Sequence, residues 1–283
     1  MLSATSVKDI KTNAKHLLYA DWFSHIAILF GFAVCTLGIV FAGSATISLL
    51  QKYAHLTDID FNLLTTFFAL LTVFGAIPLS YGVCVYFYNV ANGHKADVMD
   101  LFYAFGNTNA FRRSFCLFWA LLWRFSLIFS IPSYLVQRSM TALYEDDFLY
   151  YFYGDFDIGY FLVSVYLFLL IFAAFSFFAR YFAAIYLTVS NEYVPVSVCF
   201  STAAFALSCH KGKHSFARLI WSYFILIVVS VLTVGILLIL YTVPLMLIAC
   251  FFNAAKLLES DEIRLYYNAL LNDPPDRDSG ISQ

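Results

Sequence analysis

The sequence predicts an all-α membrane protein: a polytopic helix bundle with six transmembrane helices and amphipathic helices on its cytoplasmic surface. Three observations predict it. Of the 283 residues, 62% are hydrophobic and only 12% are charged, whereas soluble domains carry about 25% charged residues. The mean hydropathy is +0.79, and long apolar runs recur along the chain. This composition excludes a disordered tail, a disulfide-rich secreted scaffold and an ordinary cytosolic enzyme.

The apolar runs match the bilayer, whose core of ~30 Å requires about 20 residues of helix. The predicted spans cover residues 25–50, 61–89, 111–136, 159–190, 216–233 and 235–256. The last two belong to one apolar stretch, 216–253, which as a single helix would be about 57 Å long. A break at Thr233-Val234-Gly235 splits this stretch into a hairpin. The alternative is five spans with a partly re-entrant final segment.

The distribution of Lys and Arg favours six spans with both termini in the cytoplasm. With that topology, twelve of the 16 basic residues lie on the cytoplasmic side, Lys52 and Arg138 lie outside, and Arg124 and Arg180 fall within spans. Positive charge concentrates on cytoplasmic loops, so we expect a multi-pass protein of the cell inner (plasma) membrane. Residues 25–257 then form the membrane domain, and residues 258–283 form a cytoplasmic tail.

Residues 1–24 precede the first span, and their pattern predicts a cytoplasmic amphipathic helix. The apolar residues that recur at helical spacing are Val7, Ile10, Ala14, Leu17 and Leu18. Lys8, Lys11 and Lys15 occupy other faces, which is typical of a helix that lies on an anionic leaflet. A solvated leader is the alternative.

Two later segments, 98–105 and 196–205, carry similar apolar stripes, each followed by basic residues and then by a span. These segments predict further surface helices on the cytoplasmic side. The first span is predicted to be retained, because its apolar run is too long for a cleaved signal sequence.

Arg124 is the main candidate for a ligand-binding residue. It lies near the middle of the third span, beside Trp119 and Trp123, and no Asp or Glu lies inside any predicted span. A central Arg costs about 2.5–3.5 kcal/mol on insertion scales, so polar partners are expected: backbone carbonyls, hydroxyls, water or an anionic ligand. One interpretation is a cavity for an anion or a lipid phosphate, with Arg124, Arg180 and Trp123 as binding residues. The other is a structural Arg that bonds carbonyls or snorkels to the interface.

The sequence predicts no catalytic residue, no metal site and no cofactor. It contains no H-E-x-x-H, no G-x-S-x-G and no P-loop motif. The six Cys include no C-x-x-C pair and are interpreted as buried free thiols. Cys209, His210 and His214 have loose ligand spacing, but no second pair stands nearby. The acidic external loop 137–158 is interpreted as solvated rather than as a calcium site.

Several short motifs resemble those of a known family. They read PLSYG at 78–82, YFYNVANG at 86–93, DLF at 100–102, HKGK at 210–213 and LTVGI at 232–236. Together with the basic helix before the first span, they make the chain resemble a bacterial polytopic membrane family known as domain of unknown function nine-seventy-five. That family is distantly similar to the membrane domain of some glycerophosphodiester phosphodiesterases. The resemblance covers about residues 7–257; it implies a bacterial membrane bundle and no catalytic residue.

The expected function is that of a non-enzymatic protein that binds or moves a lipid or small amphiphile, or that serves as an accessory subunit. Membrane lipids are the expected partners, with other membrane proteins as further partners. A net charge of −2 gives no basic face for nucleic acid. The alternative is a secondary transporter or channel with an anion site near Arg124. An intramembrane enzyme is disfavoured, because no nucleophile and base pair is visible.

Overall fold

The computed structural model describes residues 7–54, 58–145, 181–209 and 238–272, together with positions 166, 218–219, 221–223 and 226–227. Every regular element in these residues is a helix, so the all-α fold is confirmed for the part of the chain that is described. Three helices there are long and apolar enough to cross a bilayer: Trp22–Tyr53, Asp60–Ala91 and Leu240–Leu258. They match three predicted spans and are consistent with a membrane protein, while the total of six stays a prediction.

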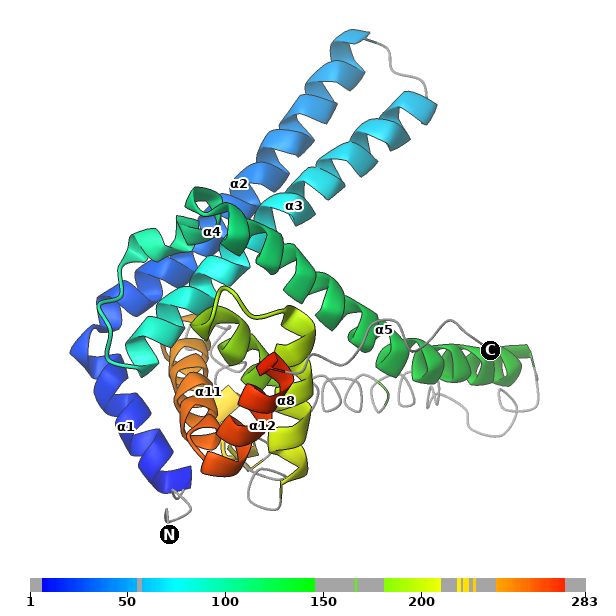
Figure 1. The fold of residues 1–283 in the computed structure, drawn as a ribbon. Helices are drawn as coiled ribbons and strands as arrows, with labels where there is room; N and C mark the ends of the chain where they lie inside the picture. Colours follow the sequence, from blue (N-terminus) through cyan, green and yellow to red (C-terminus); the bar gives the residue numbers. More distant parts are fainter. Residues whose placement is uncertain are drawn as a thin grey trace.

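The helices α2 (Trp22–Ala54) and α3 (Asp58–Ala91) pack against each other and project as a pair from the rest of the described chain (Figure 1). In the most apolar stretch of α2 only 11% of residues are buried, as expected of a helix that faces lipid all round. Small residues let the two backbones approach. A Cβ atom on Gly43 would stand 2.9 Å from the Phe68 ring, and one on Gly75 would stand 2.8 Å from the Ile39 side chain.

Near its end, α3 is crossed by the short helix η1 (Val98–Phe102). Asp97 and Asp100 form a reciprocal capping box that starts η1, and Leu101 is buried. A Cβ atom on Gly82 would stand 2.2 Å from the Leu101 carbonyl oxygen. Only glycine permits this close approach of the η1 backbone.

After α4 (Tyr103–Gly106), the long helix α5 (Thr108–Glu145) leads away from the body (Figure 1). The predicted third span, 111–136, lies within α5. Of the fourth predicted span, 159–190, the structure describes position 166 and the apolar helix Tyr181–Ser190. The predicted external loop 137–158 differs from the structure in its first part, because α5 continues to Glu145. The rest of that loop, most of the fifth span and the break at 233–235 lie outside the described residues.

The helix α8 (Val196–Ser208) packs beside α12 (Asp261–Asn272), where the rings of Phe205 and Tyr266 stack with centres 4.1 Å apart. The predicted apolar stripe at 196–205 is therefore helical, and it buries residues such as Cys199 and Phe200.

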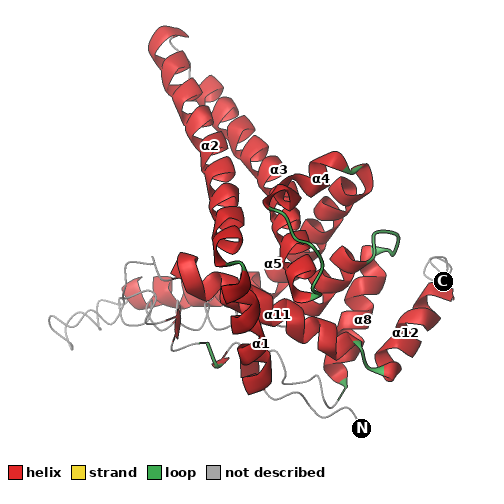
Figure 2. Ribbon diagram, turned by 90° about the vertical axis from the view of Figure 1, so that its left-hand side faces the viewer, coloured by secondary structure: helices red, strands yellow, loops and turns green. Residues whose placement is uncertain are grey.

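The helix α11 (Val243–Leu258) contributes residues such as Leu245, Ile248 and Phe251 to the buried core. It follows η2 (Leu238–Thr242), a short stretch of π-helix. The helix α1 (Val7–Ala20) runs beside α11 (Figure 2). The buried residues of α1 are Ile10, Ala14 and Leu18, all members of the apolar stripe expected from the sequence. That stripe packs against protein, and contact of α1 with the leaflet stays a prediction.

Candidate functional site

The Arg124 side chain of α5 is half-buried and is held by its own helix and by aromatic rings. Its Nη1 donates a hydrogen bond to the Ala120 carbonyl oxygen at 3.0 Å. The guanidinium carbon lies 4.2 Å from the ring centre of Phe200 in α8 and 5.9 Å from that of Tyr181. A carbonyl is one of the partners expected from the sequence, and the ring contacts add attraction between the cation and the π-electrons.

The structure does not bring the other two predicted binding residues, Trp123 and Arg180, into contact with the Arg124 side chain within the part of the chain that it describes. Trp123 is 67% exposed, so it is not buried beside Arg124. Arg180 lies outside the described residues. An anion site built from Arg124, Arg180 and Trp123 therefore stays a prediction.

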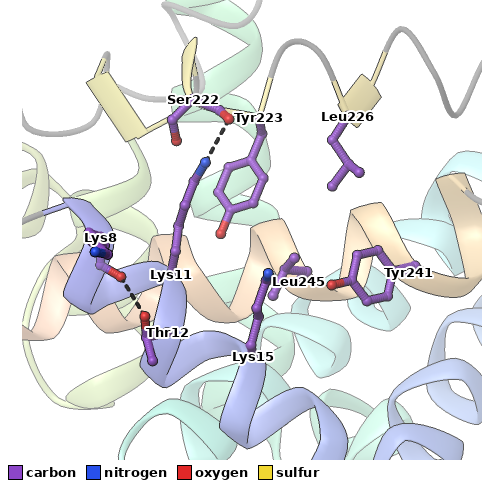
Figure 3. A pocket seen from close by; sticks show the side chains of 9 residues that line it. All are labelled: Lys8, Lys11, Thr12, Lys15, Ser222, Tyr223, Leu226, Tyr241 and Leu245. Atoms are coloured by element: carbon purple, nitrogen blue, oxygen red, sulfur yellow. Dashed lines mark hydrogen bonds between the residues drawn. The ribbon is translucent and has the colours of Figure 1, made fainter.

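A cavity of about 400 Å³ lies between α1, the described positions 222, 223 and 226, the helix η2 and the start of α11 (Figure 3). We call it the lysine–tyrosine cavity. It is lined by Lys8, Lys11, Thr12, Lys15, Ser222, Tyr223, Leu226, Tyr241 and Leu245. The three lysines share one face of α1, because they are three and four residues apart. No carboxylate occurs among these described lining residues, and the volume falls in the range of small-molecule sites.

Lys11 forms part of the cavity wall. Its Nζ donates a hydrogen bond to the Ser222 carbonyl oxygen at 2.6 Å and lies 4.5 Å from the centre of the Tyr223 ring. Burial, and then repulsion from Lys15, lower the pKa of Lys11 below its usual value. Ammonium groups close enough to repel one another favour a bound anion, because its negative charge stabilises both of them.

The Tyr223 hydroxyl is the group in the cavity that most strongly indicates a ligand. The residue is 2% exposed, and its hydroxyl has no hydrogen-bond partner among the residues that the structure describes. Buried hydroxyls are nearly always bonded. Figure 3 shows the Lys15 side chain reaching from α1 toward the space between the Tyr223 and Tyr241 hydroxyls. A ligand in that space would find both a cation and an unused donor.

Two sets of hydrogen bonds fix α1 and the start of α2 beside the cavity. Trp22 Nε1 donates to the Leu240 carbonyl oxygen in η2 at 3.0 Å. The buried His25 ring lies with Nε2 3.2 Å from the Leu17 carbonyl oxygen and Nδ1 2.8 Å from the Tyr86 hydroxyl. Because a carbonyl can only accept, we assign the hydrogen to Nε2. His25 thus joins α1, α2 and α3.

Arg113 forms a second polar centre, at the beginning of α5. It is 6% exposed, and its guanidinium donates to the carbonyl oxygens of Thr188 at 2.9 Å, Glu192 at 2.8 Å and Val194. These carbonyls lie at and just beyond the carboxyl end of the helix Tyr181–Ser190, where positive charge is favourable.

The Glu192 carboxylate extends this centre, because it accepts hydrogen bonds from the Tyr103 hydroxyl and the Asn107 amide. Sequence reasoning counted Arg113 only as a loop cation and missed its burial. The pair Arg112-Arg113 before an apolar run was the sequence feature that could have indicated a buried arginine. The pattern alone does not show which of the two side chains is buried. We assign the cluster a structural role, since Arg113 donates to backbone carbonyl oxygens and the Glu192 carboxylate accepts from a neighbouring hydroxyl and amide.

The cysteines are free. Cys199 is buried in α8, and burial raises the pKa of its thiol, which disfavours the reactive thiolate. Among the described residues, no group of three or more His, Cys, Asp or Glu is placed to hold a metal ion.

No protein-family model, no curated protein sequence and no solved structure matches the chain. The resemblance to the family of unknown function stays a prediction.

Proposed function

We propose that this chain is a non-enzymatic integral membrane protein that binds an anionic lipid or small amphiphile. The lysine–tyrosine cavity carries the proposal. One wall presents ammonium groups from α1, and the other presents Leu226, Leu245 and two tyrosine rings. A molecule with an anionic head and an apolar body would contact both walls, whereas a fully polar anion would leave the apolar wall uncovered.

The proposed topology has six spans and both termini in the cytoplasm. Leu245 belongs to the helix Leu240–Leu258, which is long and apolar enough to cross the bilayer. In this topology α1 lies on the cytoplasmic side, where anionic lipids attract basic segments by about 1 kcal/mol for each Lys near the surface. A sixth span that enters from outside would begin at the opposite face, so the hydrogen bond from Trp22 to Leu240 favours the alternative of five spans with a partly re-entrant final segment.

The test is purification in mild detergent with native lipids, followed by mass spectrometry of the retained molecules. The wild type is compared with a variant carrying Lys8→Gln, Lys11→Gln and Lys15→Gln. We expect the wild type to retain a defined anionic amphiphile and this variant to lose most of it.

A matched control removes the same charge elsewhere, through Lys52→Gln, Lys95→Gln and Lys256→Gln. None of these three residues lines the cavity, so retention should stay at the wild-type level. Equal retention by all three proteins, at equal folded fraction, would contradict the proposal.

The second candidate is a secondary transporter or channel with an anion site near Arg124. It is favoured by the half-buried guanidinium of Arg124 on a long helix, which donates to the Ala120 carbonyl oxygen and has five donor hydrogens in all. On this alternative, Arg124→Lys loses anion flux in proteoliposomes while folding survives, because a planar fork grips oxygen pairs better than an ammonium. Arg124→Leu abolishes flux without loss of stability. A lower melting temperature in Arg124→Leu with unchanged ligand retention would exclude this site.

A further inference from the structure

The charged side chains that line the lysine–tyrosine cavity are all donors, because three lysines and no carboxylate occur among its described lining residues. A lysine ammonium has three donors and no acceptor. The Tyr223 hydroxyl hydrogen has no acceptor among the described residues. The molecule that completes the cavity therefore has to bring acceptor oxygens.

Charge distinguishes the anionic groups that could supply those oxygens. Lys15 approaches from α1, while Tyr223 comes from the opposite wall (Figure 3). A carboxylate has two oxygens in one plane, and a phosphodiester has two terminal oxygens and a single charge. A phosphomonoester has three terminal oxygens and a charge of about −1.5 to −2 at pH 7. Its higher charge also suits a wall on which Lys11 and Lys15 repel each other.

We propose that the lysine–tyrosine cavity recognises a phosphomonoester, with Lys15 as its counter-ion and Tyr223 donating a hydrogen bond to a terminal oxygen. This inference rests on the proposed function and names its ligand class. Lys11, held by the Ser222 carbonyl oxygen and the Tyr223 ring, positions that tyrosine. The group can come from the head of a membrane lipid or from a soluble phosphate ester.

The test titrates the purified full-length protein, in neutral detergent, with four probes: short-chain phosphatidate, short-chain phosphatidylglycerol, a fatty acid and inorganic phosphate. Native mass spectrometry reports the bound fraction. We expect phosphatidate to bind about tenfold more tightly than phosphatidylglycerol or the fatty acid, the equivalent of one hydrogen bond to a charged group. Competition by inorganic phosphate identifies a soluble ester as the source, and its absence identifies a lipid.

Tyr223→Phe keeps the ring and removes only the hydroxyl. It should weaken phosphatidate binding about tenfold and leave phosphatidylglycerol binding nearly unchanged. Tyr193→Phe, at a residue that is 87% exposed, is the matched control. Lys15→Gln is the second variant and should also weaken phosphatidate most. Phosphatidate binding should fall as the pH drops below about 6, where the phosphate takes up its second proton.

Two failures are distinguishable. Equal affinity for phosphatidate and phosphatidylglycerol, with both weakened in Lys15→Gln and neither in Tyr223→Phe, overturns the phosphomonoester and leaves amphiphile binding standing. No binding of any amphiphile by the folded wild type overturns both proposals.

Discussion

The Tyr86 hydroxyl lies 2.8 Å from Nδ1 of the buried His25 ring, and this contact joins α3 to α2. Because Nε2 of the same ring lies 3.2 Å from the Leu17 carbonyl oxygen, one imidazole also holds the end of α1. The packing of α1 against α11 therefore depends on a side chain outside both helices.

Tyr86→Phe should destabilise the protein by about 1 kcal/mol, because His25 then loses its donor. His25→Phe should cost more, about 1–3 kcal/mol for each group left buried without a partner. Thermal unfolding in detergent measures both changes. Limited trypsin cleavage within α1, at Lys8, Lys11 and Lys15, should also increase in His25→Phe. Unchanged cleavage and melting in both variants would show that the histidine does not hold α1.

Arg113 and Arg112 are neighbours with different environments, and they form a matched pair for mutation. Arg113→Met removes a buried guanidinium that serves three carbonyl oxygens. At about 1.5–3 kcal/mol for each hydrogen bond to a charged group, the expected loss exceeds about 3 kcal/mol. Arg112 is exposed, so Arg112→Met should change the free energy of unfolding by about 0.5 kcal/mol or less. Equal effects of the two substitutions in denaturant or thermal unfolding would contradict the assigned structural role.

Gly82→Ala should destabilise the crossing of η1 over α3. The added Cβ atom would stand 2.2 Å from the Leu101 carbonyl oxygen, and a backbone atom cannot move aside cheaply. We expect a loss of about 1–3 kcal/mol, typical of overpacking. Gly38→Ala in α2 is the control, because nothing lies within 4 Å of its added atom. A neutral Gly82→Ala in a thermal melt would mean that η1 does not pack this closely.

The stability of the α4 region should depend on pH through Tyr103. Burial, and then the hydrogen bond to Glu192, raise the pKa of Tyr103 to about 12, compared with about 10 in an unfolded chain. Since the folded state favours the neutral phenol, this contribution is complete below about pH 10 and is lost as the pH rises through about 12. Unfolding measured across this window should show a steeper loss for the wild type than for Tyr103→Phe. If the free energy of unfolding falls equally with pH in the wild type and in Tyr103→Phe, Tyr103 does not contribute to this pH dependence.

Reporter fusions test the topology directly. Fusions after Asn92, Lys213 and Leu271 should report the cytoplasm, and a fusion near Asp147 should report the outside. An external reporter after Leu271 would exclude six spans, because the hairpin at Gly235 would then not exist.

Hydropathy predicted three of the long helices well, because contact with lipid leaves a continuous apolar run in the sequence. The predicted span 25–50 is observed within a helix that begins at Trp22 and ends at Ala54, since helical hydrogen bonding continues past the apolar core. The apolar face of α1 was also predicted correctly from the sequence, because its buried residues repeat at helical spacing, every four positions.

The polar sites were harder to predict from the sequence, because the residues that contact each arginine lie far away in the chain. Arg124 meets the ring of Phe200, and Arg113 meets carbonyls 75 to 81 residues away. The lysines of α1 were predicted, but the cavity was not. It requires Tyr223 and Tyr241, and nothing in the local pattern of either residue relates it to α1.

The contact of Trp22 with Leu240 spans 218 residues, and it has a consequence for biosynthesis. A ribosome adds about 5–20 residues per second, so α1 is exposed for roughly 10 to 40 seconds before η2 and α11 exist. During that interval α11, the helix against which most of its apolar stripe packs, is missing. Docking of α1 is thus a late event in assembly, and the cavity forms only when that event is complete. A chain truncated before η2 would insert α2 and α3 and leave the cavity open.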